Sequence, residues 1–196
     1  MTTDNFKKHS SKNPLQRFLI DRFLDALVAE TEALHPGKIL DAGCGEGFTL
    51  EKLRQRAVGQ VLVGVDIQQR AIGLGHEIHS HLDMQQGSVY ELPFKDDTFD
   101  AVICSEVLEH LEDPKKALGE LARVTKRYVI ITVPNEPFFR LANFLRGKNM
   151  SRLGNDIEHV QHWSSRGIAE FARKEFEVRK IRTPFPWTIL VGEKRI

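Results

Sequence analysis

Long apolar runs, clustered cysteines and an excess of charge of one sign are all missing from this sequence of 196 residues. No stretch of about 18 apolar residues occurs, so the sequence predicts no membrane-spanning helix. The first residues, MTTDNFKKHSSKN, lack the hydrophobic region of a secretion signal. We therefore expect a cytoplasmic protein.

The cysteine content and the net charge argue against two further classes of protein, those held by disulfides and those that bind nucleic acid. Only Cys44 and Cys104 occur, without metal-type spacing, which argues against a disulfide framework and favours two small buried residues. The formal net charge is +1, and phosphate-backbone affinity needs a concentrated basic surface. We expect no nucleic-acid partner, and we interpret the mildly basic region at 140–182 as a solvated face.

Short apolar runs alternate with helical patterns along the chain. The predicted strands are KILDAG, VLVGVD, FDAVICS and YVIITVP, with a weaker one around LDMQQGSV. Helices are predicted from Pro14 to Leu34 and over 47–57, 68–79 and 113–124, and Asp113-Pro114 opens the last of these. Such alternation indicates an α/β domain with a mainly parallel, helix-covered sheet.

The C-terminal part has a different pattern. Residues 135–163 carry no predicted strand and look like an insertion, after which SSRGIAEFARKEF reads as a helix. FEVRKIRT and WTILVGEK are two final strands, and their short connection predicts antiparallel pairing. We expect one domain over 1–196, with residues 1–12 disordered.

A glycine-rich turn, DAGCGEG at 41–47, links the first strand to a helix. Glycine allows close backbone approach, and the helix N-terminus favours an anion. The dinucleotide fingerprint fails because Phe48 stands where its third glycine belongs, and no G-K-[ST] phosphate loop is present. Asp41 instead suits a cation, so the turn suits a zwitterionic amino-acid group.

Asp66 ends the second strand, where an acid commonly accepts hydrogen bonds from ribose hydroxyls. A ligand with a ribose, an amino acid and no phosphate between them is S-adenosylmethionine. An ordinary acid at a strand end is the alternative reading of Asp66 alone.

These motifs resemble the class I S-adenosylmethionine-dependent methyltransferases, in their small-molecule branch. The acidic glycine loop, Asp66 and the stretch GSVYELPFKDDTFDAVICSEVLEHLEDP carry the resemblance over about residues 36–134. It implies a Rossmann-like, seven-stranded, mostly parallel sheet with an antiparallel last strand and helices on both faces. The residues it implies for binding S-adenosyl-L-methionine are Asp41, Gly43, Cys44, Gly45, Gly47, Phe48, Asp66, Ile67, Ser88, Val89, Ser105 and Glu106.

The chain departs from the family at the adenine loop. Family members often place an acid there, where this sequence has Ser88, so the contact to adenine is expected to be weaker. Metal-dependent relatives have an Asp-Asn pair near the fifth strand, and Pro134-Asn135 lacks that acid. We expect no metal.

Methyl transfer needs the acceptor aligned with the methyl group, and a histidine can serve as general base. His110 lies just past the fourth strand, and the alternative is that it packs a short helix there. His159 and His162 can share one face of a helical turn. They are candidate acceptor contacts, with a structural role and a metal role as alternatives.

The insertion at 135–163 has an apolar stripe with basic neighbours. It could cover the acceptor as a lid, dock on the sheet, or rest on a membrane surface to reach a lipid-like acceptor. The favoured function is methyl transfer to a small-molecule acceptor, at an oxygen, nitrogen or carbon atom. The alternatives are a non-catalytic S-adenosylmethionine-binding sensor or partner subunit, and a nicotinamide-dependent oxidoreductase.

Overall fold

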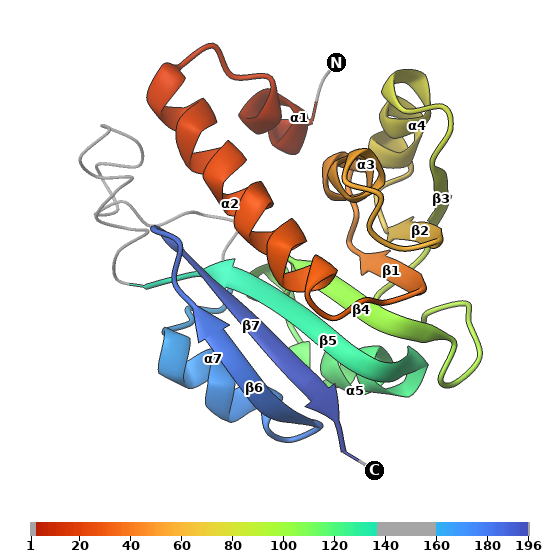
Figure 1. The fold of residues 1–196 in the computed structure, drawn as a ribbon, viewed down its shortest axis with the longest axis vertical. Coiled ribbons are helices and arrows are strands. Elements are labelled where there is room, and N and C mark those ends of the chain that lie inside the picture. Colours follow the sequence, from red (N-terminus) through yellow and green to blue (C-terminus); the bar gives the residue numbers. More distant parts are fainter. Residues whose placement is uncertain (1–2, 137–159, 196) are drawn as a thin grey trace.

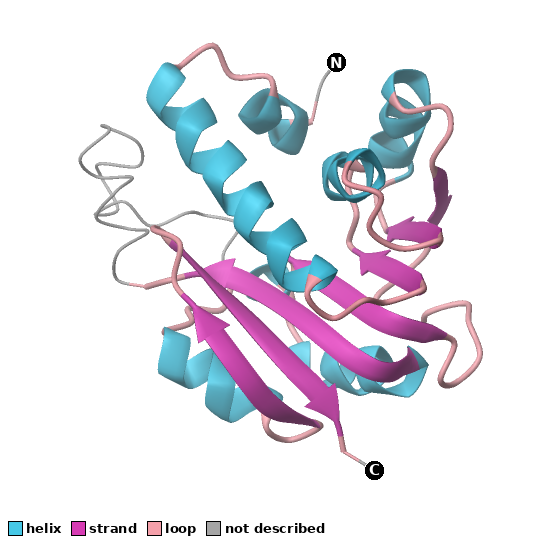
Figure 2. Ribbon diagram, in the orientation of Figure 1, coloured by secondary structure: helices cyan, strands magenta, loops and turns pink. Residues whose placement is uncertain are grey.

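The computed structural model describes residues 3–136 and 160–195, which form one mixed sheet covered by helices (Figures 1 and 2). The strands are β1 Lys38–Ala42, β2 Val61–Asp66, β3 Asp83–Gln86, β4 Phe99–Ser105, β5 Thr125–Pro134, β6 Phe176–Arg182 and β7 Trp187–Lys194. The helices are α1 Asp4–His9, α2 Pro14–Glu32, α3 Phe48–Gln55, α4 Gln69–Ile78, the 3-10 turn η1 Leu108–His110, α5 Pro114–Val124 and α7 Ser165–Ala172.

The seven strands lie in the order β3-β2-β1-β4-β5-β7-β6. The first five pair in parallel, whereas β7 is antiparallel to both β5 and β6. The predicted fold class is therefore confirmed, including the weak strand β3 and the antiparallel last strand. The chain moves outward from β1 to β3 and then returns to β4 on the other side of β1, which makes the β1/β4 boundary a topological switch point.

Helices cover both faces of the sheet, as predicted (Figure 1). On one face α2 and α3 pack on the sheet, in a cluster that includes Leu27, Leu53, Ile103 and Ile130. On the other face α5 and α7 cover a larger cluster that includes Leu121 and Ile168. The central strands are buried on both faces, which explains why they read as continuous apolar runs.

Capping residues place the helix starts where the sequence predicted them. The Asn13 side chain accepts hydrogen bonds from the backbone N–H groups of Leu15 and Gln16, just before Pro14. Asp113 caps α5 in the same way, by accepting from the backbone of Lys116. Proline fits both first turns because the N–H that it lacks has no helical partner there.

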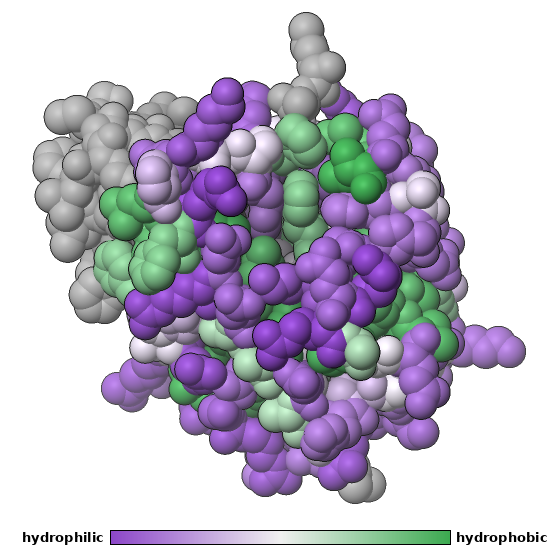
Figure 3. Space-filling view, turned by 45° about the horizontal axis from the view of Figure 1, so that its top comes forward, coloured by the Kyte–Doolittle hydropathy of each residue, from purple (hydrophilic) through white to green (hydrophobic). Residues whose placement is uncertain are grey.

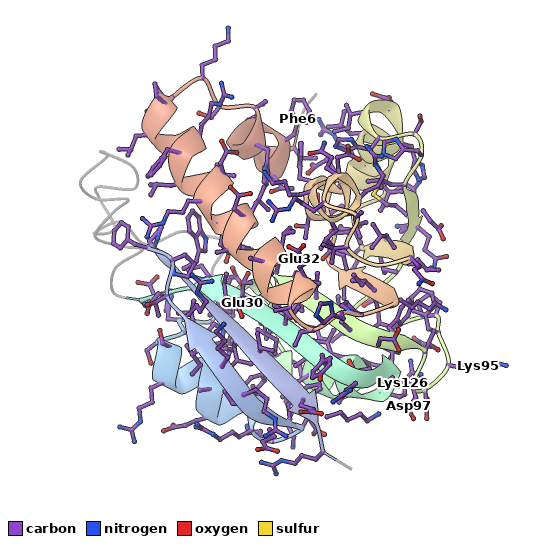
Figure 4. The ribbon with its side chains drawn as sticks, in the orientation of Figure 1. Phe6, Glu30, Glu32, Lys95, Asp97 and Lys126 are labelled. Carbon is purple, nitrogen blue, oxygen red and sulfur yellow. The ribbon has the colours of Figure 1, made fainter. Side chains whose placement is uncertain are left out.

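A cluster of ion pairs connects the C-terminal half of α2 to the edge strand β6. Glu30, labelled in Figure 4, is buried and accepts hydrogen bonds from Lys180 Nζ and Arg182 Nη1, both at 2.9 Å. Burial alone would raise the pKa of Glu30, but these two cations outweigh that effect and lower it. The cluster joins residues about 150 positions apart in the sequence.

The N-terminal segment differs from the expectation of disorder over residues 1–12. Residues 4–9 form helix α1, and Thr3 caps it by accepting a hydrogen bond from the Phe6 backbone at 3.1 Å. Thr3 and Asn5 also contact Glu46, a remote residue of the chain, and composition alone does not reveal that contact.

The face drawn in Figure 3 is mainly hydrophilic, with separate hydrophobic patches. Large apolar side chains that are exposed include Leu15 and Phe18 on α2 and Phe185 before β7. Among the described helices, none combines the length and the apolar character that a membrane crossing needs. His159 and most of the predicted insertion at 135–163 lie outside the described residues.

Candidate functional site

The glycine loop lies at the carboxyl edge of the sheet, next to the switch point. The backbone N–H groups of Gly43 and Cys44 both donate to the Val65 carbonyl of β2, at 2.7 and 3.0 Å. The Gly47 N–H donates to the Cys44 carbonyl at 2.9 Å and closes the turn into α3. In open α/β sheets, this edge is where ligands bind.

Glycine is required in the loop for both conformation and space. Gly43, Gly45 and Gly47 all have positive φ, at 90°, 55° and 84°. A Cβ atom at Gly43 would overlap Cγ2 of Val107, which follows β4. The loop backbone is therefore packed closely against neighbouring side chains, and only glycine fits at these positions.

Asp41 is a buried acid at the end of β1, with 2% of its surface exposed. Its Oδ1 atom has no hydrogen-bond partner within the described part of the chain. Burial, together with the negative charge of Asp66, raises the pKa of Asp41 to about 7. An unpaired carboxylate oxygen in this position is an unsatisfied acceptor, which a cationic ligand group would satisfy.

Asp66 ends β2 and both of its carboxylate oxygens accept backbone hydrogen bonds. Oδ2 accepts from the Gly45 N–H at 2.9 Å, and Oδ1 accepts from the Gln68 N–H at 2.8 Å. Asp66 thus fixes the glycine loop as well as being a candidate ribose contact. The neighbouring Ile67 is 65% exposed, so its apolar side chain is open to a ligand.

Two other predicted cofactor residues, Ser88 and Val89, are already engaged within the protein. Ser88 Oγ accepts a hydrogen bond from the Tyr90 N–H at 3.1 Å, so its hydroxyl proton remains for donation. Val89 is buried against the core, with 9% of its surface exposed. Burial also raises the pKa of the Cys44 thiol, which keeps that loop residue neutral.

The end of β4 supplies a second set of polar groups on the same edge. Ser105 Oγ and Thr132 Oγ1 are hydrogen-bonded at 2.9 Å. Glu106 has a φ of 57°, and its Oε2 accepts from the Trp187 Nε1–H at 2.7 Å. Trp187 is not recognisable as a site residue from the sequence, because no pattern links the start of the last strand to the end of the fourth.

The structure brings two of the three candidate histidines into neighbouring segments. His110 ends η1, directly after β4, and its side chain is exposed. The backbone N–H groups of Val160 and Gln161 donate to the Glu109 carbonyl at 2.8 and 2.9 Å, which places the segment carrying His162 beside η1. His162 is also exposed, and His159 lies outside the described residues.

Residues near the N-terminus also reach this edge, although no motif in the sequence links them to it. Thr3 Oγ1 and Asn5 Nδ2 donate to the two carboxylate oxygens of Glu46 in the glycine loop. The His9 ring stacks on Phe48, with centroids 4.2 Å apart. The Thr3 cap was the only local signal for this segment.

No group of three potential metal-ligating side chains gathers within residues 3–136 and 160–195. His79 and His81, from the histidine-rich HEIHSH stretch, lie beside α3, where His81 Nε2 is 2.7 Å from Glu51 Oε2. Desolvation lowers the pKa of His79.

Comparison with known proteins identifies the family. A family model described as a methyltransferase domain matches residues 40–132, which run from β1 to β5 and include both Asp41 and Asp66. The chain is 35% identical over 127 residues to a demethylmenaquinone methyltransferase of Streptomyces avermitilis, covering 64% of this chain and 54% of that protein. It is 32% identical over 126 residues to a ubiquinone biosynthesis O-methyltransferase of Hahella chejuensis, covering 62% and 49%. The chain thus spans about half the length of these curated relatives.

The fold has close counterparts among solved structures. The magnesium protoporphyrin IX methyltransferase of Synechocystis PCC 6803, solved with bound SAH, superposes with a TM-score of 0.72 over 97% of this chain and 92% of that one. The sequence identity is 20%, so this likeness concerns the fold. With its family match, its strand order and its acidic glycine loop, this chain belongs to the class I S-adenosylmethionine-dependent methyltransferases.

Proposed function

We propose that this protein transfers a methyl group from S-adenosylmethionine to a small-molecule acceptor. The observation that carries the proposal is the unpartnered oxygen of buried Asp41, located beside a glycine loop that Asp66 fixes from the next strand. A ligand with an ammonium group near Asp41 would supply the hydrogen-bond donor that the Asp41 oxygen lacks. Hydroxyl groups of the same ligand near Asp66 would donate further hydrogen bonds to that carboxylate.

Different residues at the carboxyl edge would bind the amino-acid, ribose and adenine parts of the donor. Asp41 and the backbone of the loop from Gly43 to Gly47 would hold the amino-acid moiety. Asp66 would accept from the ribose hydroxyls, since each of its oxygens has capacity beyond the single backbone bond that it already accepts. Ile67, Ser88 and Val89 would line the adenine site.

The donor supplies a methyl group that is already activated by a positively charged sulfur. The protein therefore has to exclude water, to position the acceptor and, for a hydroxyl or ammonium acceptor, to remove a proton. His110 and His162 are the candidate bases, since their segments meet at the edge where β4 ends. Ser105 and Glu106 lie on the same edge and would shape the pocket around the methyl group.

The acceptor side is bounded by the segment 160–163, which joins η1 and the end of β5. Its residues bond to Glu109 at one end, and at the other the Trp163 carbonyl accepts from the Glu136 N–H at 3.0 Å. Because one relative is named a ubiquinone biosynthesis O-methyltransferase and another a demethylmenaquinone methyltransferase, phenolic and quinone precursors are the first acceptors to test.

The test is incubation of the full chain with methyl-labelled S-adenosylmethionine, first with such precursors and then with fractionated cell extract. A labelled small molecule that depends on the protein supports the proposal, and a His110→Ala variant tests the proposed base. Tight donor binding without a labelled product would instead favour the non-catalytic sensor or partner subunit. Absence of donor binding would refute the proposal.

A further inference from the structure

A fully buried carboxylate in the glycine loop is held by residues from the beginning of the chain. Glu46 accepts hydrogen bonds from Thr3 Oγ1 and Asn5 Nδ2, one on each oxygen. A buried carboxylate loses its hydration and depends on such donors. The loop and the segment 3–5 therefore stabilise each other, although they are about 40 residues apart in sequence.

The same segment lies directly over the bare backbone of the loop. A Cβ atom at Gly45 would lie 2.8 Å from Asn5 Nδ2, so Asn5 occupies the space beside this glycine. The Phe6 ring is 6.2 Å from the Phe48 ring, and Phe6 lies on the side of α1 that faces α3 (Figure 4). With the stacked His9 ring, α1 thus contacts both the loop and the first residue of α3.

On its other side α1 borders helix α2. A cavity lined by His9, Ser11, Arg17 and Asp21 lies between the end of α1 with its following loop and helix α2. Figure 1 shows α1 as a short separate helix between α2 and α3. α1 therefore contacts the glycine loop and Phe48 on one side and α2 on the other, with the cavity at its C-terminal end.

We propose that α1 is a wall of the S-adenosylmethionine site, and that Glu46 is the positioning residue that holds it over the donor. The segment Thr3–His9 covers the amino-acid end of the donor, opens to admit it and slows its release. This inference rests on the proposed donor site, but it adds the N-terminal residues as a part of that site.

Exchanging the donor and acceptor roles of Asn5 and Glu46 tests their hydrogen bond without removing it. Asn5→Asp places a second carboxylate against Glu46, and the resulting repulsion should speed the dissociation of S-adenosylhomocysteine by about tenfold or more. Asn5→Asp combined with Glu46→Gln restores a donor and an acceptor with the roles reversed. We expect this double variant to return the rate to within about threefold of wild type, as double-variant coupling requires.

Surface plasmon resonance on the full chain measures the dissociation rate, with the Glu46→Gln single variant completing the cycle. Lys115→Ala is the control, because Lys115 is exposed on α5, which covers the other face of the sheet. Equal dissociation rates for wild type, Asn5→Asp and the double variant would overturn the inference. Failure of wild type to bind S-adenosylhomocysteine would instead refute the proposed donor site.

Limited trypsin digestion gives a second measurement, which needs no variant. Cleavage after Lys7, an exposed residue of α1, requires this helix to open. Saturating S-adenosylhomocysteine should slow cleavage there by about tenfold or more if the donor is closed in under α1. Unchanged cleavage at a ligand concentration that saturates binding would overturn the inference.

Discussion

Replacing Asp41 by Asn should raise the free energy of unfolding of the protein without donor and lower its affinity for S-adenosylmethionine. Burial, with the charge of Asp66, raises the pKa of Asp41 from 3.8 to about 7. The folded chain thus prefers protonated Asp41, so the stability that this residue contributes is full below pH 3.8 and is lost as the pH rises through about 7. Asn has nearly the same shape and never carries the charge.

The magnitude follows from the displaced pKa. Each pKa unit corresponds to about 1.36 kcal/mol, so ionised Asp41 destabilises the empty fold by up to about 4 kcal/mol at pH 8. The amide of Asn needs a hydrogen-bond acceptor that the site does not supply, which costs about 1–3 kcal/mol. We therefore expect Asp41→Asn to be more stable than wild type by about 1–3 kcal/mol at pH 8.

Urea denaturation followed by circular dichroism, at pH 5 and pH 8, measures the difference. The gain should shrink or reverse at pH 5, where Asp41 is largely protonated in the folded chain. In calorimetric titrations at pH 8, the same variant should bind S-adenosylmethionine at least about tenfold more weakly, because the ligand's ammonium group loses its counter-charge. A stability difference that is equal at both pH values would refute the reasoning.

Three further predictions concern the loop and the frame around it. Asp66→Ala removes an acceptor of the Gly45 N–H and the proposed ribose contact, so S-adenosylhomocysteine affinity should fall by at least about 1 kcal/mol in calorimetric titration; unchanged affinity would contradict the assignment. Gly43→Ala should cost more than about 2 kcal/mol of unfolding free energy in urea, whereas the matched change Gly119→Ala, at a helical site with open space, should be neutral or stabilising by up to about 1 kcal/mol. Glu30→Gln should lower the thermal midpoint at pH 7, because the lowered pKa of Glu30 makes its ion pairs to β6 stabilising above about pH 4.5; the difference from wild type should vanish as the pH falls below that value.

Local signals predicted the elements of this fold well. Capping residues such as Asn13 and Asp113, together with proline in the first turn, marked the helix starts because they act on the nearest backbone groups. Apolar runs marked the central strands because both faces of the sheet are covered. The sequence predicted disorder over residues 1–12 and did not predict helix α1 or its hydrogen bonds to Glu46, because distance in sequence hides that contact.

The candidate site likewise contains residues that the sequence predicted and residues that it did not. Asp41, the three loop glycines and Asp66 were recognisable because strand ends in a parallel sheet meet at one edge, so that order along the chain predicts neighbourhood in space. The Trp187 hydrogen bond to Glu106 was not predictable, since it depends on β7 inserting between β5 and β6.

The sequence by itself determined the strand–helix alternation, the acidic glycine loop and the family to which the chain belongs, because these depend on spacing and residue type over short stretches. Only the tertiary structure decided that Asp41 is buried with an unpaired oxygen, that Asp66 anchors the loop and that α1 lies over it. Burial, pKa and contacts between remote segments depend on how the layers pack, and packing is a property of the whole chain rather than of any one motif.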